Sequence, residues 1–416
     1  MKLLIINAAQ VVTVDAHGAR AKRGHEMRDI GVIENGAVLI DDGAIAWVGT
    51  SSDASSLNIS GEAPEVLDAT GKVIMPGFVD AHTHLIFAGS REDEFALRCQ
   101  GFTYQQIAER GGGILRTVAA TRQASRKTLR SIAARRLDTM LRYGTTTAEI
   151  KSGYGLTEED ELKMLQVAHD LTMEHPMTIV NTFLGAHAIP PEFQPCRERY
   201  VDEIVSRMLP YIARKELADF VDVFCDEGYF TSEETRKILQ RASQLDFGIK
   251  LHADELAPTG AVFLAVEFNA VSVDHLEHIT QEEIDALAKS QTIAVLLPGV
   301  SFFLAHSYAP ARSLIDAGAA VAIATDYNPG SCMAFSMPLM MTIACTQMKM
   351  TPEEVITAST LNAAAALGMS KSIGSIELGK RADLVLLDIP NYLYLPYEFG
   401  GNHVWRVVKN GVLLEF

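Results

Sequence analysis

The chain has 416 residues, which is too long for a single small core and suits one large domain with a smaller companion. Hydrophobic residues make up 48% and charged residues 21%, as in ordinary globular proteins. The net charge of −16 argues against nucleic-acid and anionic-membrane partners, because both need a basic surface. A small anionic substrate stays compatible with this charge, since one well-placed arginine acts locally.

The cysteines are odd in number and scattered, and none forms a C-x-x-C pair, which indicates reduced thiols of a cytoplasmic protein. The sequence predicts no signal peptide and no membrane span. Its first apolar run, Leu3–Ile6, is short, and Pro298 and Gly299 interrupt a later one. The five cysteines are Cys99, Cys196, Cys225, Cys332 and Cys345.

Both ends of the chain have the pattern of short strands joined by turns. The dipeptide Asn410–Gly411 between two apolar runs is a strong hairpin signal, and Asp42–Gly43 occupies a similar place near the start. We therefore expect a small composite β-sandwich domain, built from residues 1–74 and 379–416. Its expected strands are Leu3–Asn7, Ala37–Ile40, Ala44–Val48, Ala382–Leu387, Val404–Val408 and Val412–Leu414.

Residues 75–378 alternate between short apolar runs and amphipathic stretches, some with capping residues such as Thr157 and Ser232. Eight such units favour an α/β fold, a (β/α)8 TIM barrel. A doubly wound open sheet is the alternative, but no glycine-rich phosphate loop follows the first strand. The expected strands are Gly77–His84, Thr145–Lys151, Thr178–His187, Phe220–Asp226, Gly248–Ala253, Ala270–His275, Thr292–Pro298 and Ala320–Asp326.

Polar residues gather at the carboxyl ends of these strands, which is where barrel enzymes place their chemistry. This placement favours the barrel more than the number of units does. The residues are His82, His84, Lys151, Tyr154, His187, Asp226, Glu227, His252, Glu255, His275 and Asp326.

Four of these residues predict a metal site. His82 and His84 are two apart on an expected strand, so both side chains can face the barrel interior. With His252 and Asp326 they provide three imidazoles and a carboxylate, which suit one zinc or iron ion with room for a water. The alternatives are chance histidines on a loop and, for His252, a satisfied core residue. The fourth strand has no lysine that could be carbamylated, which favours one metal ion over two.

Two further residues are candidates for proton transfer. Glu255 follows His252 by three residues and is well placed to move a proton between water and substrate. His275 ends the sixth strand on the same expected face. The sequence leaves open whether Glu255, His275 or Asp326 takes the proton of the water, and Glu255 can also be an ordinary acidic residue at a helix start.

The set of motifs resembles the amidohydrolase superfamily over nearly the whole chain. The resemblance rests on Pro76–His84, on His252, His275 and Asp326, and on Gly379–Val385. It implies a barrel with a metal-activated water that attacks a carbon–nitrogen bond.

Other segments resemble the imidazolonepropionases within that superfamily: Phe87–Arg91, Glu149–Leu156, Thr182–His187, Lys250–Glu255 and Ala324–Ser331. The resemblance implies hydrolytic ring opening of 4-imidazolone-5-propanoate to N-formimino-L-glutamate in histidine degradation. It also implies one zinc or iron ion per chain, a cytoplasmic location and a homodimer. The expected substrate-binding residues are Arg91 and Tyr154 for the carboxylate tail, His187 for the ring carbonyl, and Glu255, Asn328, Gly330 and Ser331.

Two other functions compete with this interpretation. A deaminase of a nucleobase-like ring would use the same metal residues, but Arg91 and Tyr154 argue for a substrate that carries a carboxylate. A non-catalytic scaffold relative is disfavoured, because this chain keeps the full set of metal residues.

Overall fold

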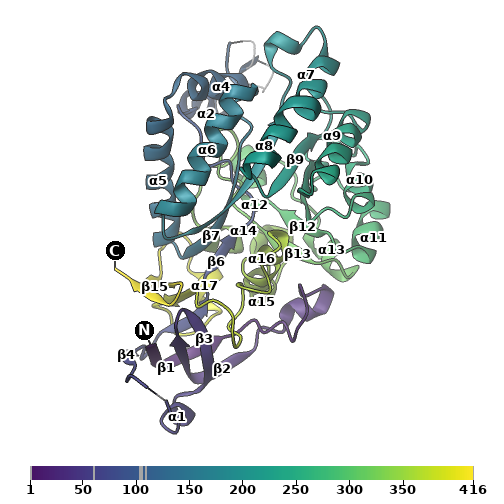
Figure 1. Cartoon of the computed structure of the whole chain (residues 1–416). Coiled ribbons are helices and arrows are strands. Elements are labelled where there is room, and N and C mark those ends of the chain that lie inside the picture. The colour runs from purple at the N-terminus through teal and green to yellow at the C-terminus, as the bar shows by residue number, and fades with distance from the viewer. Residues whose placement is uncertain (1, 60, 103–105, 108–109, 416) are drawn as a thin grey trace.

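The computed structural model describes residues 2–415 except 60, 103–105 and 108–109. A barrel of strands covered by helices makes up the larger part, and a mixed β-sheet lies against one end of it (Figure 1). The N-terminal strands and the strand β15 near the C-terminus lie together in this smaller part.

The barrel is an eight-stranded parallel sheet in sequential order from β6 to β13. This confirms the α/β class and the eight predicted strand–helix units. The strands are β6 (Phe78–Asp80), β7 (Thr145–Lys151), β8 (Thr178–Ala186), β9 (Phe220–Cys225), β10 (Gly248–Ala253), β11 (Ser272–His275), β12 (Ile293–Leu296) and β13 (Val321–Ile323).

The first and last strands end earlier than the sequence indicated, and the chain beyond them closes the barrel. The backbone N–H of Asp326 donates to the carbonyl of His82 at 3.0 Å, and that of His84 donates to the carbonyl of Tyr327 at 3.0 Å. The buried carboxylate of Asp80 accepts from the backbone N–H of Thr325 at 3.0 Å and from its hydroxyl at 2.6 Å. These bonds hold the two histidines and the aspartate side by side.

The small domain is composite, as predicted, and its strands form one mixed sheet in the order β16-β15-β14-β5-β1-β2-β3, with β4 paired to β1. The two chain ends meet where β5 pairs antiparallel with β14. Because β5 spans residues 73–76, it crosses the predicted boundary at 74, and the domain bounds stay a prediction. The strands are β1 (Lys2–Val12), β2 (Val32–Asp41), β3 (Ala44–Thr50), β4 (Glu65–Asp68), β5 (Val73–Pro76), β14 (Leu384–Leu387), β15 (Val404–Lys409) and β16 (Val412–Leu414).

Both predicted hairpins are present in this sheet. Asp42 and Gly43 have φ of 47° and 79°, and Asn410 and Gly411 have φ of 51° and 78°. Positive φ at both central residues gives the tight turn whose twist matches the flanking strands, and Asn, Asp and Gly adopt it at little cost.

Helices surround the barrel, and the predicted cap at Thr157 is confirmed. The cap predicted at Ser232 belongs to Thr231, which forms a capping box with Glu234.

Among the described helices, none is long and apolar enough to cross a membrane. The barrel helices are α2 (Glu92–Cys99), α4 (Ile114–Gln123), α5 (Arg126–Arg142), α6 (Glu158–Glu174), α7 (Arg197–Glu203), α8 (Leu209–Lys215), α9 (Ser232–Gln244), α10 (Ala261–Glu267), α11 (Gln281–Lys289), α12 (Pro298–Leu304), α13 (Ala311–Asp316), α14 (Met337–Met348), α15 (Pro352–Ala358) and α16 (Leu361–Ala366). The short helix α1 (Ser51–Ala54) accompanies the small sheet, and α17 (Tyr394–Tyr397) packs against α14.

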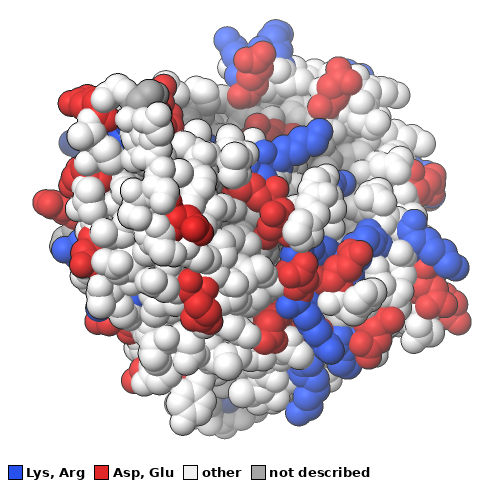
Figure 2. Space-filling model, turned by 90° about the horizontal axis from the view of Figure 1, so that it is seen from below, with Lys and Arg blue, Asp and Glu red and all other residues white. Residues whose placement is uncertain are grey.

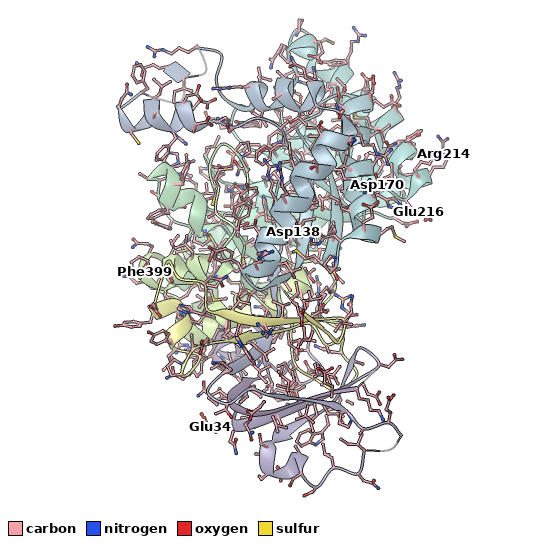
Figure 3. All side chains as sticks on the ribbon, turned by 90° about the vertical axis from the view of Figure 1, so that its left-hand side faces the viewer. Glu34, Asp138, Asp170, Arg214, Glu216 and Phe399 are labelled. Atoms are coloured by element: carbon pink, nitrogen blue, oxygen red, sulfur yellow. The ribbon has the colours of Figure 1, made fainter. Side chains whose placement is uncertain are left out.

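A side view separates the two parts: Glu34 on the small sheet lies below Asp138 of α5 and Asp170 of α6 (Figure 3). The small sheet has an apolar core of its own, which includes Ile5 and Leu384. On the face seen from below, basic side chains are interspersed with acidic ones (Figure 2).

Candidate active site and metal centre

Three histidine nitrogens and one carboxylate oxygen converge at the carboxyl end of the barrel. The Nε2 atom of His84 lies 3.3 Å from that of His82 and 3.4 Å from that of His252. Asp326 Oδ1 lies 3.4 Å from His82 Nε2 and 3.3 Å from His84 Nε2. A tetrahedral ion with bonds of about 2.1 Å has edges of about 3.4 Å between its ligand atoms. The four distances match these edges. His82, His84 and Asp326 form one group that could hold a metal ion, and His252 lies next to it beside His84.

The charge of the donor set also fits a cation. Asp326 is buried, and its Oδ1 atom has no hydrogen-bond partner among the described residues. Burial raises the pKa of this carboxyl, but the nearby rings of His82 and His84 outweigh burial and hold the pKa well below its usual range. Burial lowers the pKa values of His84 and His252, which favours the neutral imidazole that binds metal. The pKa of His82 is raised instead, because its contacts with Asp274 and Asp326 outweigh burial. A buried carboxylate beside two neutral imidazoles suits zinc or ferrous iron.

His275 stands beside this set and carries a different charge. Its Nδ1 atom lies 3.5 Å from Glu255 Oε2 and 3.7 Å from Glu277 Oε2. Burial lowers the pKa of His275, but the two carboxylates outweigh it and raise the pKa to about 10. Although His275 is close enough to His82 and His252 to be grouped with them, a protonated ring has no free lone pair for a metal.

Two aspartates that the sequence analysis did not assign orient the metal histidines. Asp274 Oδ2 lies 2.6 Å from His82 Nδ1, and Asp222 Oδ2 lies 3.0 Å from His252 Nδ1. Each carboxylate places the proton of its ring on Nδ1 and leaves Nε2 free for a metal. The signal in the sequence was an aspartate in the middle of an apolar strand, a position that is costly unless the charge is paired.

Above the metal residues lies a cavity of about 540 Å³. Every predicted site residue lines it except His82, which lies behind the others. The cavity also brings in residues that the sequence analysis did not single out, among them Glu94, Arg98, Phe224, Tyr229 and His306.

Arg91 is held at this cavity by a carboxylate that the sequence did not reveal. Its Nε and Nη2 atoms each donate to Glu94 Oε2 at 2.8 Å. The remaining nitrogen, Nη1, lies against Gly330, where an added Cβ would be only 2.5 Å away. The carbonyl of Gly330 accepts from Arg98 Nη1 at 3.1 Å. Gly330 thus allows two guanidinium groups to approach one turn of backbone.

Tyr154 and His187 lie close together over the metal residues, with ring centres 5.4 Å apart. Glu161 of α6 holds the loop of Tyr154 by accepting from the backbone N–H groups of Gly153, Gly155 and Leu156 at 2.7 to 3.2 Å.

The protonation of His187 follows from its partner. Its Nδ1 atom lies 3.0 Å from the carbonyl oxygen of Gly153, and a carbonyl can only accept, so Nδ1 carries the proton. Burial and the neighbouring His84 lower the pKa of His187 to about 3, so the ring is neutral and its Nε2 is an acceptor.

Asn328 braces the loop that carries Asp326. Its Nδ2 donates to Asp326 Oδ2 at 2.8 Å and to Ser331 Oγ at 2.6 Å, while its Oδ1 accepts from the backbone N–H groups of Gly330 and Ser331. Both ends of this amide are occupied within the protein, so Asn328 and Ser331 orient Asp326 in addition to lining the cavity.

Glu255 faces His275, and Asp226 fixes the position of its backbone. The Asp226 carboxylate accepts from the backbone N–H groups of residues 255, 256 and 257 at 2.8 to 3.2 Å. Burial, which the nearby carboxylates reinforce, raises the pKa of Glu255 to about 7. A carboxyl with this pKa can take up and release a proton at neutral pH.

Residues 73–414 match the model of the amidohydrolase family, and the chain belongs to this family. Within it, the chain is 49% identical over 412 residues to an imidazolonepropionase from Parabacteroides distasonis, covering 99% of this chain and 98% of the relative. An imidazolonepropionase from Symbiobacterium thermophilum is 49% identical over 414 residues, covering 99% and 97%. These similarities over the full length place the chain among the imidazolonepropionases.

Solved structures share the fold at lower identity. An adenosine deaminase from Xanthomonas campestris with bound zinc has a TM-score of 0.71 at 22% identity, covering 99% of this chain and 92% of that one. A guanine deaminase from E. coli has a TM-score of 0.74 at 16% identity, covering 100% and 99%. At this identity the likeness concerns the fold alone.

Proposed function

We propose that this protein hydrolyses 4-imidazolone-5-propanoate to N-formimino-L-glutamate. One observation carries the proposal: the candidate metal ligands His84, His252 and Asp326 line the same cavity as the guanidinium group of Arg91. The site suits attack by water on a ring amide, and the guanidinium suits a carboxylate tail. The imidazolonepropionase relatives support this choice of substrate.

Recognition of the carboxylate falls to Arg91. Because Glu94 occupies Nε and Nη2, the arginine is already oriented and presents Nη1 toward the Gly330 turn. Arg91, Arg98 and Glu94 together leave one positive charge, which matches the single carboxylate of the substrate. Tyr154 lines the same cavity, and its hydroxyl can donate to this anion.

Attack on the ring needs an activated water and a proton carrier. One zinc or iron ion held by His82, His84, His252 and Asp326 would lower the pKa of a water and polarise the ring carbonyl. Glu255 takes the proton of the attacking water. The oxygen adds to the carbonyl carbon, the C–N bond breaks, and Glu255 returns the proton to the departing nitrogen.

The two remaining histidines take separate roles. His275 is an imidazolium and stabilises negative charge that develops on the carbonyl oxygen. His187 was expected to donate to that oxygen, but its neutral Nε2 is an acceptor, and we assign it the ring N–H of the substrate instead.

The proposal also covers the cellular compartment and the oligomeric state of the enzyme. The five cysteines are free, which supports a reducing, cytoplasmic location. A homodimer, and the lack of nucleic-acid and membrane partners, remain predictions. Light scattering on the purified chain during gel filtration tests the dimer.

The direct test is the ultraviolet absorbance of fresh 4-imidazolone-5-propanoate with purified protein, with and without a chelator. We expect rapid loss of the ring absorbance that the chelator abolishes, with N-formimino-L-glutamate as the product. No loss above the spontaneous rate from metal-replete protein, together with ammonia release from a nucleobase, would favour the deaminase alternative.

A further inference from the structure

A buried lysine lies behind the metal histidines. The Lys151 ammonium is fully buried at the end of β7 and donates to Asp222 Oδ2 at 2.6 Å, to Glu149 Oε1 at 3.1 Å and to Asp274 Oδ2 at 3.4 Å. One cation thus contacts three carboxylates from three strands. The reaction proposed above does not use it.

Two of these carboxylates are the ones that orient metal ligands. Asp274 holds His82, and Asp222 holds His252 and also accepts from its backbone N–H at 3.1 Å. A single carboxylate therefore separates Lys151 from each of the two metal ligands, His82 and His252. Any change in its charge acts on both ligands at once.

The space that Lys151 occupies has the composition of a second metal site. His82, Glu149 and Asp274 present potential ligand atoms within 4.8 Å of one another, and all three residues are buried. Carboxylates gathered in this way need a cation between them. The Lys151 ammonium is that cation.

The charges of the buried site agree with this arrangement. Glu149, Asp222 and Asp274 carry three negative charges, and Lys151 and Lys250 carry two positive ones. This cluster therefore keeps one negative charge, and a divalent ion in place of the Lys151 ammonium would bring its sum to zero.

We propose that Lys151 is a positioning residue whose ammonium fills the second cation position of the centre and so limits the enzyme to one metal ion. The proposal rests on the metal-dependent function proposed above. It concerns the number of ions, which a purely structural salt bridge would not control.

The test counts zinc in the full-length protein. Wild type, Lys151→Ala and Lys250→Ala are stripped with a chelator, equilibrated with excess Zn²⁺, freed of unbound metal and measured by mass spectrometry. Lys250 is the matched control, because it is also buried and bonds Glu149 Oε2 at 2.8 Å, but it has no direct bond to Asp222 or Asp274 within the described part of the chain. We expect one zinc per chain in wild type and Lys250→Ala, and two in Lys151→Ala.

Each other outcome overturns a defined claim. One zinc in Lys151→Ala, or two in wild type, overturns the role of Lys151 and leaves the proposed function standing. Wild type without zinc overturns both. If Lys151→Ala is unstable in isolation, thermal unfolding against Zn²⁺ concentration replaces the count. At saturating Zn²⁺ the free energy of unfolding of the variant must rise with the logarithm of the Zn²⁺ concentration about twice as steeply as that of wild type, since each bound ion stabilises the folded state, and equal slopes overturn the proposal.

Discussion

His82 Nδ1 lies 2.6 Å from Asp274 Oδ2, deep in the barrel and on the far side of the ring from the metal site. Because this carboxylate fixes the ring, Asp274→Ala should weaken zinc binding about 10- to 100-fold. Competition with a chelator measures the change. Asp285→Ala on the exposed side of α11 is the control, and equal affinity in both variants would contradict the orienting role of Asp274.

Glu255→Gln should keep its metal and lose turnover. The amide preserves the shape of the side chain but cannot carry the proton, and a general base contributes about 10²- to 10⁴-fold. Steady-state kinetics and metal analysis on the same preparation measure both effects. Glu227→Gln, at an exposed position of a neighbouring loop, should behave as wild type. Full turnover in Glu255→Gln would remove this residue from the mechanism.

The pH dependence of kcat/KM should report the ionisation of Glu255. The carboxyl must be deprotonated to accept a proton, and its pKa is raised to about 7. Below that pH the protonated fraction grows, so kcat/KM should fall about tenfold for each further pH unit. The residual activity of Glu255→Gln should lack this acidic limb. A flat profile in wild type between pH 5 and pH 7 (roughly the range of the limb) would refute the assignment.

Gly330→Ala should impair recognition of the carboxylate tail. An added Cβ would lie 2.5 Å from Arg91 Nη1 and displace the guanidinium. A hydrogen bond to a charged group contributes about 1.5–3 kcal/mol, so KM should rise roughly 10- to 150-fold. A ring substrate without the propanoate tail should show no such rise. Gly401→Ala, far from the cavity, is the control, and unchanged KM in Gly330→Ala would argue that Arg91 does not bind the tail.

The sequence predicted the barrel and the four metal residues because their signals are local. Eight apolar runs separated by amphipathic stretches define the strand–helix units, and motifs such as His82–Thr83–His84 place ligands at strand ends. The hairpins at Asp42–Gly43 and Asn410–Gly411 follow from residue types that tolerate positive φ. These features depend on residues that are close together in the chain, and they can therefore be predicted from the sequence alone.

Only the tertiary structure decided how distant side chains pair. Lys151 and Asp222 are 71 positions apart, and His82 and Asp274 are 192 apart, so no local pattern links them. Barrel closure brings their strands into one buried space, where charges must be matched because burying an unpaired charge is costly. The same closure placed Gly153 against His187 and so made that ring an acceptor, a property that the histidine in the sequence does not carry by itself.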